Sequence, residues 1–113
     1  MSGITTHVLD TAAGRPAAGV AVRLERREGH AWHPLAAGTT DADGRLASLL
    51  PPDHELHAGE YRLTFATGTY YAARGIESFH PEIAIAFEVR RPEEHFHVPL
   101  LIAPHGYTTY RGS

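Results

Sequence analysis

The alternation of apolar and polar residues along the chain predicts a protein built from short β-strands. Phe96, Val98, Leu100 and Ile102 fall on one face of residues 96–102, and this face is apolar. The other face carries His97, Pro99 and Leu101. Turn-forming residues separate such segments at intervals of about 8–12 residues, a spacing typical of an antiparallel β-sandwich. Further strands are expected over residues 4–10, 20–25, 32–38, 45–50, 60–65, 83–89 and 107–113.

Glycine and proline indicate where these strands end. The turn expected over residues 41–44 closes with Gly44, which can supply a positive φ. Residues 104–106 contain a proline and a glycine and separate the last two strands. One helix is expected over residues 67–74, with Gly75 in the position that follows a helix end.

The alternation of inward and outward positions along the strands places two histidines and one arginine away from the core. His7 lies between Thr6 and Val8, which define the core face of the first strand, so it points outward. His97 alternates with the apolar positions of its own strand and also points outward. Arg45 precedes an apolar residue at the start of its strand and is expected to do the same.

Composition narrows the possible functions. With 113 residues the chain is expected to form one domain, residues 1–113, whose modest core leaves any small-molecule site as a shallow groove or a subunit interface. The formal net charge of −3 gives no basic patch for nucleic acid, and the absence of cysteine excludes thiol chemistry. No targeting segment or membrane-spanning apolar run is visible, so no membrane association and a cytoplasmic location are expected.

Three stretches carry a resemblance to a known family. The C-terminal run HFHVPLLIAPHGYTTYRGS, residues 95–113, resembles the end of the 5-hydroxyisourate hydrolases of the transthyretin family. Residues 6–10 with residues 14–17 are similar to the first strand and turn of that family, and residues 40–45 to its middle motif. The matches lie near the start, middle and end, so the likeness spans the chain, and the terminal Tyr-Arg-Gly-Ser is its most specific part.

The resemblance implies a fold and an assembly. It implies a transthyretin-like (prealbumin-like) antiparallel β-sandwich of two four-stranded sheets with one short helix. It places His7, Arg45 and His97 on the outer face of a single sheet, where Tyr110 can join them. It also implies a homotetramer, a dimer of dimers, whose sites lie at the dimer–dimer interface.

The activity implied by the resemblance is ring opening of 5-hydroxyisourate to 2-oxo-4-hydroxy-4-carboxy-5-ureidoimidazoline, in the breakdown of urate to allantoin. Histidine can move protons near neutral pH, and arginine offers a fork of donors to a developing oxyanion, so no metal or cofactor is required. Which histidine is the base is left open. The expected roles are proton transfer for His7 and His97, oxyanion and anion binding for Arg45, orientation of water or the substrate amide for Ser113, and substrate binding for Tyr110, Arg111 and Gly112, together with His7 and Arg45.

Other interpretations stay open at this point. A transthyretin-type carrier could bind a small hydrophobic ligand in the same channel, and a purely structural sandwich would have no activity. His95-x-His97 resembles a pair of zinc ligands, but no third ligand is spaced nearby. Asp41-x-Asp43 lacks the rest of a calcium loop and is better explained as a turn. Surface or turn positions are expected for His30, His33, His54, His57, His80 and His105.

Overall fold

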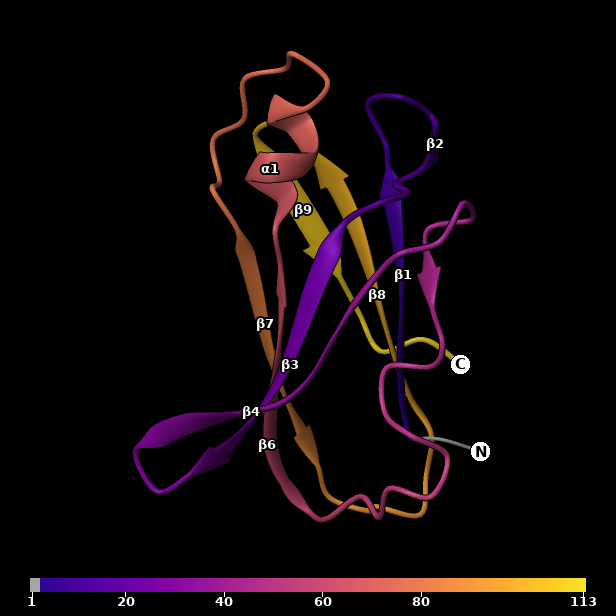
Figure 1. The fold of residues 1–113 in the computed structure, drawn as a ribbon, viewed down its shortest axis with the longest axis vertical. Helices are drawn as coiled ribbons and strands as arrows, with labels where there is room; N and C mark the ends of the chain where they lie inside the picture. The colour runs from indigo at the N-terminus through magenta and orange to yellow at the C-terminus, as the bar shows by residue number, and fades with distance from the viewer. Residues whose placement is uncertain (1–2) are drawn as a thin grey trace.

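Two β-sheets pack face to face, and a short helix covers one end between them (Figure 1). The computed structural model describes residues 3–113 and measures 39 × 29 × 20 Å. Within this part of the chain, no helix has the length and apolar character needed to cross a membrane. The elements are β1 (Ile4–Asp10), β2 (Arg15–Pro16), β3 (Ala21–Glu28), β4 (Ala31–Thr39), β5 (Arg45–Leu46), β6 (Gly59–Phe65), α1 (Thr67–Ala72), β7 (Ile83–Val89), β8 (Phe96–Ala103) and β9 (Gly106–Thr109).

The sandwich predicted from the sequence is confirmed, with two differences in its strand pairing. One sheet has the order β4-β3-β6-β7, and the other has the order β2-β1-β8-β9 with β5 also paired to β1. This second sheet therefore has five strands rather than four, because the two-residue strands β2 and β5 both pair with β1. The pair β1–β8 is parallel, whereas the other pairs are antiparallel. Apolar and polar residues alternate in the same way in parallel and antiparallel strands, so the sequence pattern could not reveal that β1 and β8 are parallel.

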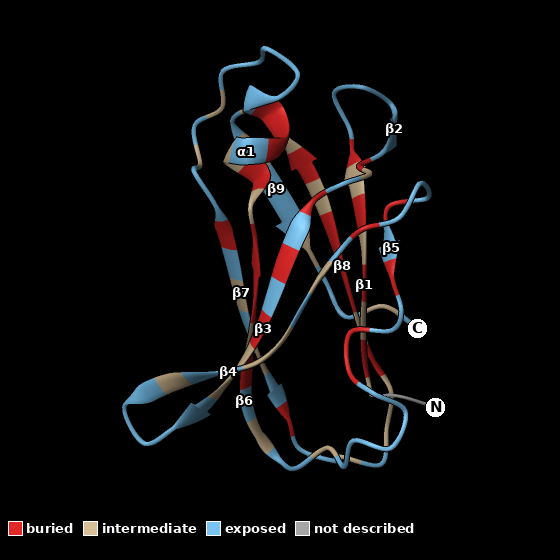
Figure 2. Ribbon diagram, in the orientation of Figure 1, coloured by how far each residue is buried: buried red, intermediate tan, exposed pale blue. Residues whose placement is uncertain are grey.

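The core lies between the two sheets, and burial alternates along the strands that line it (Figure 2). Each large apolar side chain that is fully buried there contributes about 1.5–3 kcal/mol. Thr6 shares the inward face of β1 and is buried, and its hydroxyl donates to the carbonyl of Val98 at 2.6 Å. The neighbours of these inward residues must therefore face outward, as the parity argument predicted. The core residues without solvent exposure include Ile4, Val8, Val20, Leu24, Leu63, Phe65, Leu100 and Ile102.

Helix α1 ends two residues earlier than predicted, and the predicted glycine closes it. Gly75 has φ of 69°. The N–H of Ile76 donates to the carbonyl of Tyr71 and that of Gly75 to the carbonyl of Ala72, both at 3.0 Å. These two bonds form a Schellman motif, which satisfies carbonyls that the last helical turn leaves open.

A buried carboxylate fixes α1 to the end of β1. Asp10 is 2% exposed and accepts the hydroxyls of Tyr70 at 2.9 Å and Tyr71 at 3.3 Å. Its Oδ1 also accepts the N–H groups of Ala12 and Ala13. Burial raises the pKa of both tyrosines, so their hydroxyls stay protonated and remain donors.

Two predicted strands are shorter than expected. The strand predicted over residues 45–50 is limited to β5, although Leu49 and Leu50 beyond it are still buried. The last strand ends at Thr109 rather than at the terminus, and pairing resumes only at a single bridge between His97 and Gly112. Residues 15–16, predicted as part of a turn, form β2.

The predicted turn over residues 41–44 joins β5 to the middle of β1. Asp41 Oδ1 accepts the N–H groups of Asp43 and Arg45, both at 2.9 Å. Gly44 has φ of 75°, and its carbonyl accepts the N–H of Val8 at 2.7 Å. The turn therefore sets the position at which Arg45 enters the sheet.

We predict that Gly44→Ala is more destabilising than Gly14→Ala. Both glycines have positive φ, so each substitution should cost about 1 kcal/mol in backbone strain. A Cβ at position 44 would also collide with the carbonyl of Val8, whereas a Cβ at position 14 meets nothing within 4 Å. Urea unfolding should therefore show an additional loss of about 1–3 kcal/mol for Gly44→Ala. Equal losses in the two variants would contradict the close approach.

Candidate active site

The five-stranded sheet brings His7, Arg45 and His97 to one outer face. His7 of β1 lies directly opposite Arg45 of β5 in the antiparallel register. On its other side β1 runs beside β8, where Thr5 is the partner of His97. Residues opposite each other on neighbouring strands share a face, so the two imidazoles and the guanidinium belong to one surface.

His7 is held by a backbone carbonyl of the turn. Its Nε2 lies 2.9 Å from the carbonyl oxygen of Asp43, and the side chain is half-buried. A carbonyl only accepts hydrogen bonds, so Nε2 carries a proton and neutral His7 has its lone pair on Nδ1. The contact therefore selects one tautomer of His7.

His97 is half-buried and lies close to other basic side chains. Its Nδ1 lies 2.8 Å from Thr5 Oγ1. Burial is the main cause that lowers its pKa, and the nearby charges of His95, His7 and Arg45 lower it further. An imidazole whose pKa lies below its usual value is uncharged at pH 7 and can accept a proton.

Gly112 packs against the ring of His97. Its N–H donates to the carbonyl of His97 at 2.8 Å. A Cβ added to Gly112 would lie 2.6 Å from Cδ2 of His97 and 3.1 Å from Cγ of Pro99. Only glycine therefore allows this approach, and the structure gives Gly112 a packing contact with His97. The substrate contact expected for Gly112 stays a prediction.

Arg45 presents its guanidinium to solvent. The residue is exposed, and within residues 3–113 its side chain has no hydrogen-bond or ion-pair partner. Its planar fork of donors is therefore available to an anionic ligand.

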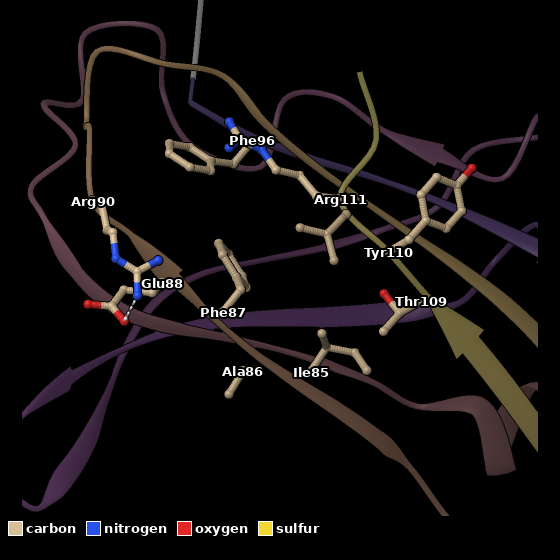
Figure 3. A pocket seen from close by; sticks show the side chains of 10 residues that line it. Ile85, Ala86, Phe87, Glu88, Arg90, Phe96, Thr109, Tyr110 and Arg111 are labelled. Atoms are coloured by element: carbon tan, nitrogen blue, oxygen red, sulfur yellow. Dashed lines mark ion pairs between the residues drawn. The ribbon is translucent and has the colours of Figure 1, made fainter.

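The C-terminal residues do not all reach this face. Tyr110 is 56% exposed, and Figure 3 shows its ring directed away from the side chain of Arg111. Arg111 Nη2 donates to Glu94 Oε1 at 3.2 Å and to the carbonyl of His95 at 3.1 Å. The guanidinium also lies 4.5 Å from the centre of the Phe96 ring. The structure thus separates Arg111 from His7 and Arg45, because successive residues of an extended tail point to opposite faces.

The hollow near Arg111 lies between the edges of the two sheets (Figure 3). It has a volume of about 300 Å³, and its apolar lining includes Ile85 and Phe87 of β7 and Val98 of β8. It is separate from the face that carries the histidines, because Val98 belongs to the inward positions of β8. Ser113, the other predicted tail residue, is exposed.

Sequence reasoning did not identify two residues that contact the candidate histidines, Thr5 beside His97 and Asp43 beside His7. Thr5 Oγ1 lies 2.8 Å from His97 Nδ1 and 2.9 Å from His95 Nε2. Thr5 precedes His7 by two positions on the same strand, so parity alone could have placed it on this face. The carbonyl of Asp43 has no sequence signal, because every residue carries one.

The remaining histidines lie outside this cluster. Within the described residues, no three or more His, Cys, Asp or Glu side chains are grouped so that they could hold a metal ion. His80 is half-buried, and its ring makes edge contacts with Phe79 and Tyr107. The exposed histidines are His30, His33, His54, His57 and His105, as expected.

The sandwich and its outer face define a transthyretin-like protein whose sheet surface carries acid–base and anion-binding side chains. The chain belongs to the HIUase/Transthyretin family, whose sequence model matches residues 4–112.

Similar proteins include 5-hydroxyisourate hydrolases and a transthyretin solved with thyroxine. The chain is 49% identical to the 5-hydroxyisourate hydrolase of Caulobacter vibrioides, over the full length of both proteins. It superimposes on the structure of Klebsiella pneumoniae 5-hydroxyisourate hydrolase with a TM-score of 0.86 and 45% identity, covering 99% of this chain and 100% of that one. Sea bream transthyretin in complex with thyroxine gives a TM-score of 0.89 and 31% identity, covering 96% and 93%. The fold alone therefore does not distinguish hydrolysis from thyroxine binding, and the distinction has to come from the side chains of the site.

We predict that Arg45→Met raises the pKa of His97, because the substitution removes a positive charge that disfavours the imidazolium. NMR titration of the histidine ring signals measures this pKa. Arg23→Met, in the other sheet, is the matched control and should leave it unchanged. An unchanged value in Arg45→Met would mean that the guanidinium is too distant or too well solvated to act on His97.

The lowered pKa of His97 also determines how the free energy of unfolding changes with pH. The pKa of His97 in the folded protein lies below the value of about 6.5 expected in the unfolded chain. Between those values the unfolded state binds more protons, so the contribution of His97 to the free energy of unfolding decreases as the pH falls through this window.

Proposed function

We propose that this protein hydrolyses 5-hydroxyisourate to 2-oxo-4-hydroxy-4-carboxy-5-ureidoimidazoline, a step in the degradation of urate to allantoin. The observation that carries the proposal is the convergence of His7, Arg45 and His97 on one outer face. The pKa of His97 is lowered there, and the guanidinium of Arg45 has no partner among residues 3–113. The full-length similarity to proteins named 5-hydroxyisourate hydrolase supports it.

The reaction needs one proton moved from water and one delivered to nitrogen. A neutral histidine accepts a proton as a water oxygen attacks the ring carbonyl, and the carbonyl oxygen becomes an oxyanion. The tetrahedral intermediate then collapses, the C–N bond breaks, and an imidazolium returns a proton to the leaving ring nitrogen. Such acid–base help is worth about 10²–10⁴-fold. The lowered pKa of His97 supports a role as the base, and His7 is the second proton-transfer group.

Arg45 is the group proposed to bind the oxyanion and the anionic substrate. A preorganised donor to an oxyanion contributes about 10²–10³-fold in rate. The exposed position of Arg45 at the start of β5 lets it approach a ligand lying over His7. Tyr110 and Ser113 remain proposed for holding the substrate and orienting water, whereas the contacts of Arg111 with Glu94 favour a role in fixing the tail.

The carrier alternative has less support. The solved transthyretin that resembles this chain holds thyroxine, so the fold is compatible with such a ligand. However, a binding channel for a hydrophobic molecule has no need for two imidazoles and an exposed guanidinium on its wall. The polar character of the outer face favours hydrolysis.

The proposed assembly is a homotetramer, a dimer of dimers with sites at the dimer–dimer interface. Two observations support it. The candidate face of one chain is open, so a facing subunit would be needed to exclude water from it. In addition, β7 and β9 are edge strands beside an apolar hollow, each paired on one side only, and such edges are suited to pairing with another copy. The cytoplasmic location expected from the sequence belongs to this proposal as well.

The direct test is the decay of freshly generated 5-hydroxyisourate. Urate oxidase converts urate to this compound, and its ultraviolet absorbance falls slowly without a catalyst. Added protein should speed the decay in proportion to its concentration. Decay at the uncatalysed rate, together with tight binding of thyroxine, would instead establish the carrier.

We predict that Arg45→Lys loses about 10²-fold or more in kcat while the assembly is unchanged. Lysine keeps the charge but not the planar pair of donors. The measurement is the steady-state rate, with mass determined in solution by light scattering. Arg23→Lys, an exposed arginine of the other sheet, is the control and should retain full activity. Near-normal turnover by Arg45→Lys would show that only the charge of the guanidinium matters.

We also predict that a C-terminal extension, or deletion of residues 111–113, abolishes turnover while the sandwich still folds. The deletion removes Gly112, which pairs with the backbone of His97, and an extension places new chain beside the same ring. A misplacement of about 1 Å can cost 10²-fold in rate. Circular dichroism should report an intact fold, and an N-terminal extension is the control expected to be active. A fully active C-terminal fusion would remove Ser113 from the site.

A further inference from the structure

We propose that Thr5 is a positioning residue that sets which ring nitrogen of His97 carries the proton, and that it does so by sharing its hydroxyl with His95. The inference rests on the proposed role of His97 in hydrolysis. Thr5 itself does not touch the reacting atoms in this account.

The sheet holds the threonine hydroxyl between two imidazoles. Thr5 Oγ1 lies 2.8 Å from His97 Nδ1 and 2.9 Å from His95 Nε2, and all three residues are half-buried. Thr5 is also the direct backbone partner of His97 across the β1–β8 pair. A β-branched side chain on a paired strand has little rotational freedom, so the hydroxyl stays in place.

The hydrogen count of a hydroxyl couples the two rings. It has one hydrogen to donate and two lone pairs, so Thr5 can donate to His95 or to His97 but not to both. If Thr5 donates to His95 Nε2, then His97 must supply the hydrogen for its own bond, from a protonated Nδ1. The lone pair of neutral His97 is then on Nε2.

This arrangement is the one that a general base requires. Nδ1 of His97 is occupied by Thr5, and within the described residues Nε2 makes no hydrogen bond, so Nε2 is the nitrogen left for water or substrate. The opposite arrangement, with Thr5 donating to His97 Nδ1, would place the proton on Nε2 and leave no lone pair for water. Either direction satisfies the hydroxyl, and we assign the one in which Thr5 donates to His95, because it gives the tautomer of His97 that the proposed function requires.

His95 contributes by accepting the threonine hydrogen. Its Nε2, 2.9 Å from Thr5 Oγ1, can receive the threonine hydrogen when His97 donates from Nδ1. The pattern His95-x-His97, considered from sequence as a possible metal pair, thus becomes two imidazoles joined through one hydroxyl. Alternation along β8 explains the spacing, because residues two apart lie on the same face.

The test compares Thr5→Val with Thr5→Ser. Valine keeps the branched shape and removes the hydroxyl, whereas serine restores a hydroxyl. ¹⁵N-detected ring correlations of histidine in the intact protein, recorded above pH 7.5, report the tautomer of His97. The unmodified protein and Thr5→Ser should carry the proton on Nδ1, and Thr5→Val should shift it toward Nε2, the form that free histidine prefers.

Turnover should follow the tautomer. Thr5→Val should lower kcat by about 10- to 100-fold with little change in KM, the range seen when the partner that orients a metal-bound imidazole is removed. Thr5→Ser should recover most of this loss. Thr39→Val, which changes an exposed strand threonine of the other sheet, is the control for a general effect of the substitution.

The outcomes separate this inference from the proposed function. A proton on Nε2 of His97 in the unmodified protein would overturn it, as would an unchanged tautomer and kcat in Thr5→Val. Absence of hydrolysis by the unmodified protein would refute the function itself. Hydrolysis together with an insensitive tautomer would refute only the role of Thr5.

Discussion

The parallel pairing of β1 with β8 is the constraint on which the candidate site depends. It places Ile4 beside Phe96 and Val8 beside Leu100, and these residues are buried in the core. A slip of one residue in either strand would turn these apolar side chains toward solvent, and the free energy gained by burying them would be lost. The hydrophobic core therefore fixes the register, and the register in turn places the outward residues of the two strands at fixed distances from each other.

Both backbone groups and side chains orient the histidines on the outer face that this pairing creates. His7 is oriented by a carbonyl of the turn that precedes β5, and His97 by the hydroxyl of its cross-strand partner. Gly112 completes the surround of the His97 ring because it has no side chain. The two imidazoles thus differ in their environments, and burial together with neighbouring charges lowers the pKa of His97. Two histidines in different surroundings can serve as donor and acceptor in one reaction.

Much of the fold and part of the site could be predicted from the sequence, because alternation reports which face a residue occupies. This was sufficient to place His7, Arg45 and His97 outward. It could not give the direction of β8 relative to β1, since a parallel and an antiparallel pair have the same period and about 85 residues separate the two strands. It also could not show that Arg111 turns to Glu94 and the Phe96 ring, because that depends on groups close by only in space.

The hydrogen bond between His7 and the turn has a consequence for how sequences of this kind can change. Its acceptor is the main-chain oxygen of Asp43, whose own side chain is not needed for the contact. Substitutions at position 43 that keep the turn would therefore leave His7 in the same tautomer. The restriction falls instead on the next residue, where the backbone conformation of Gly44 aims that oxygen. A glycine without a reactive side chain thereby helps to orient a histidine of the candidate site.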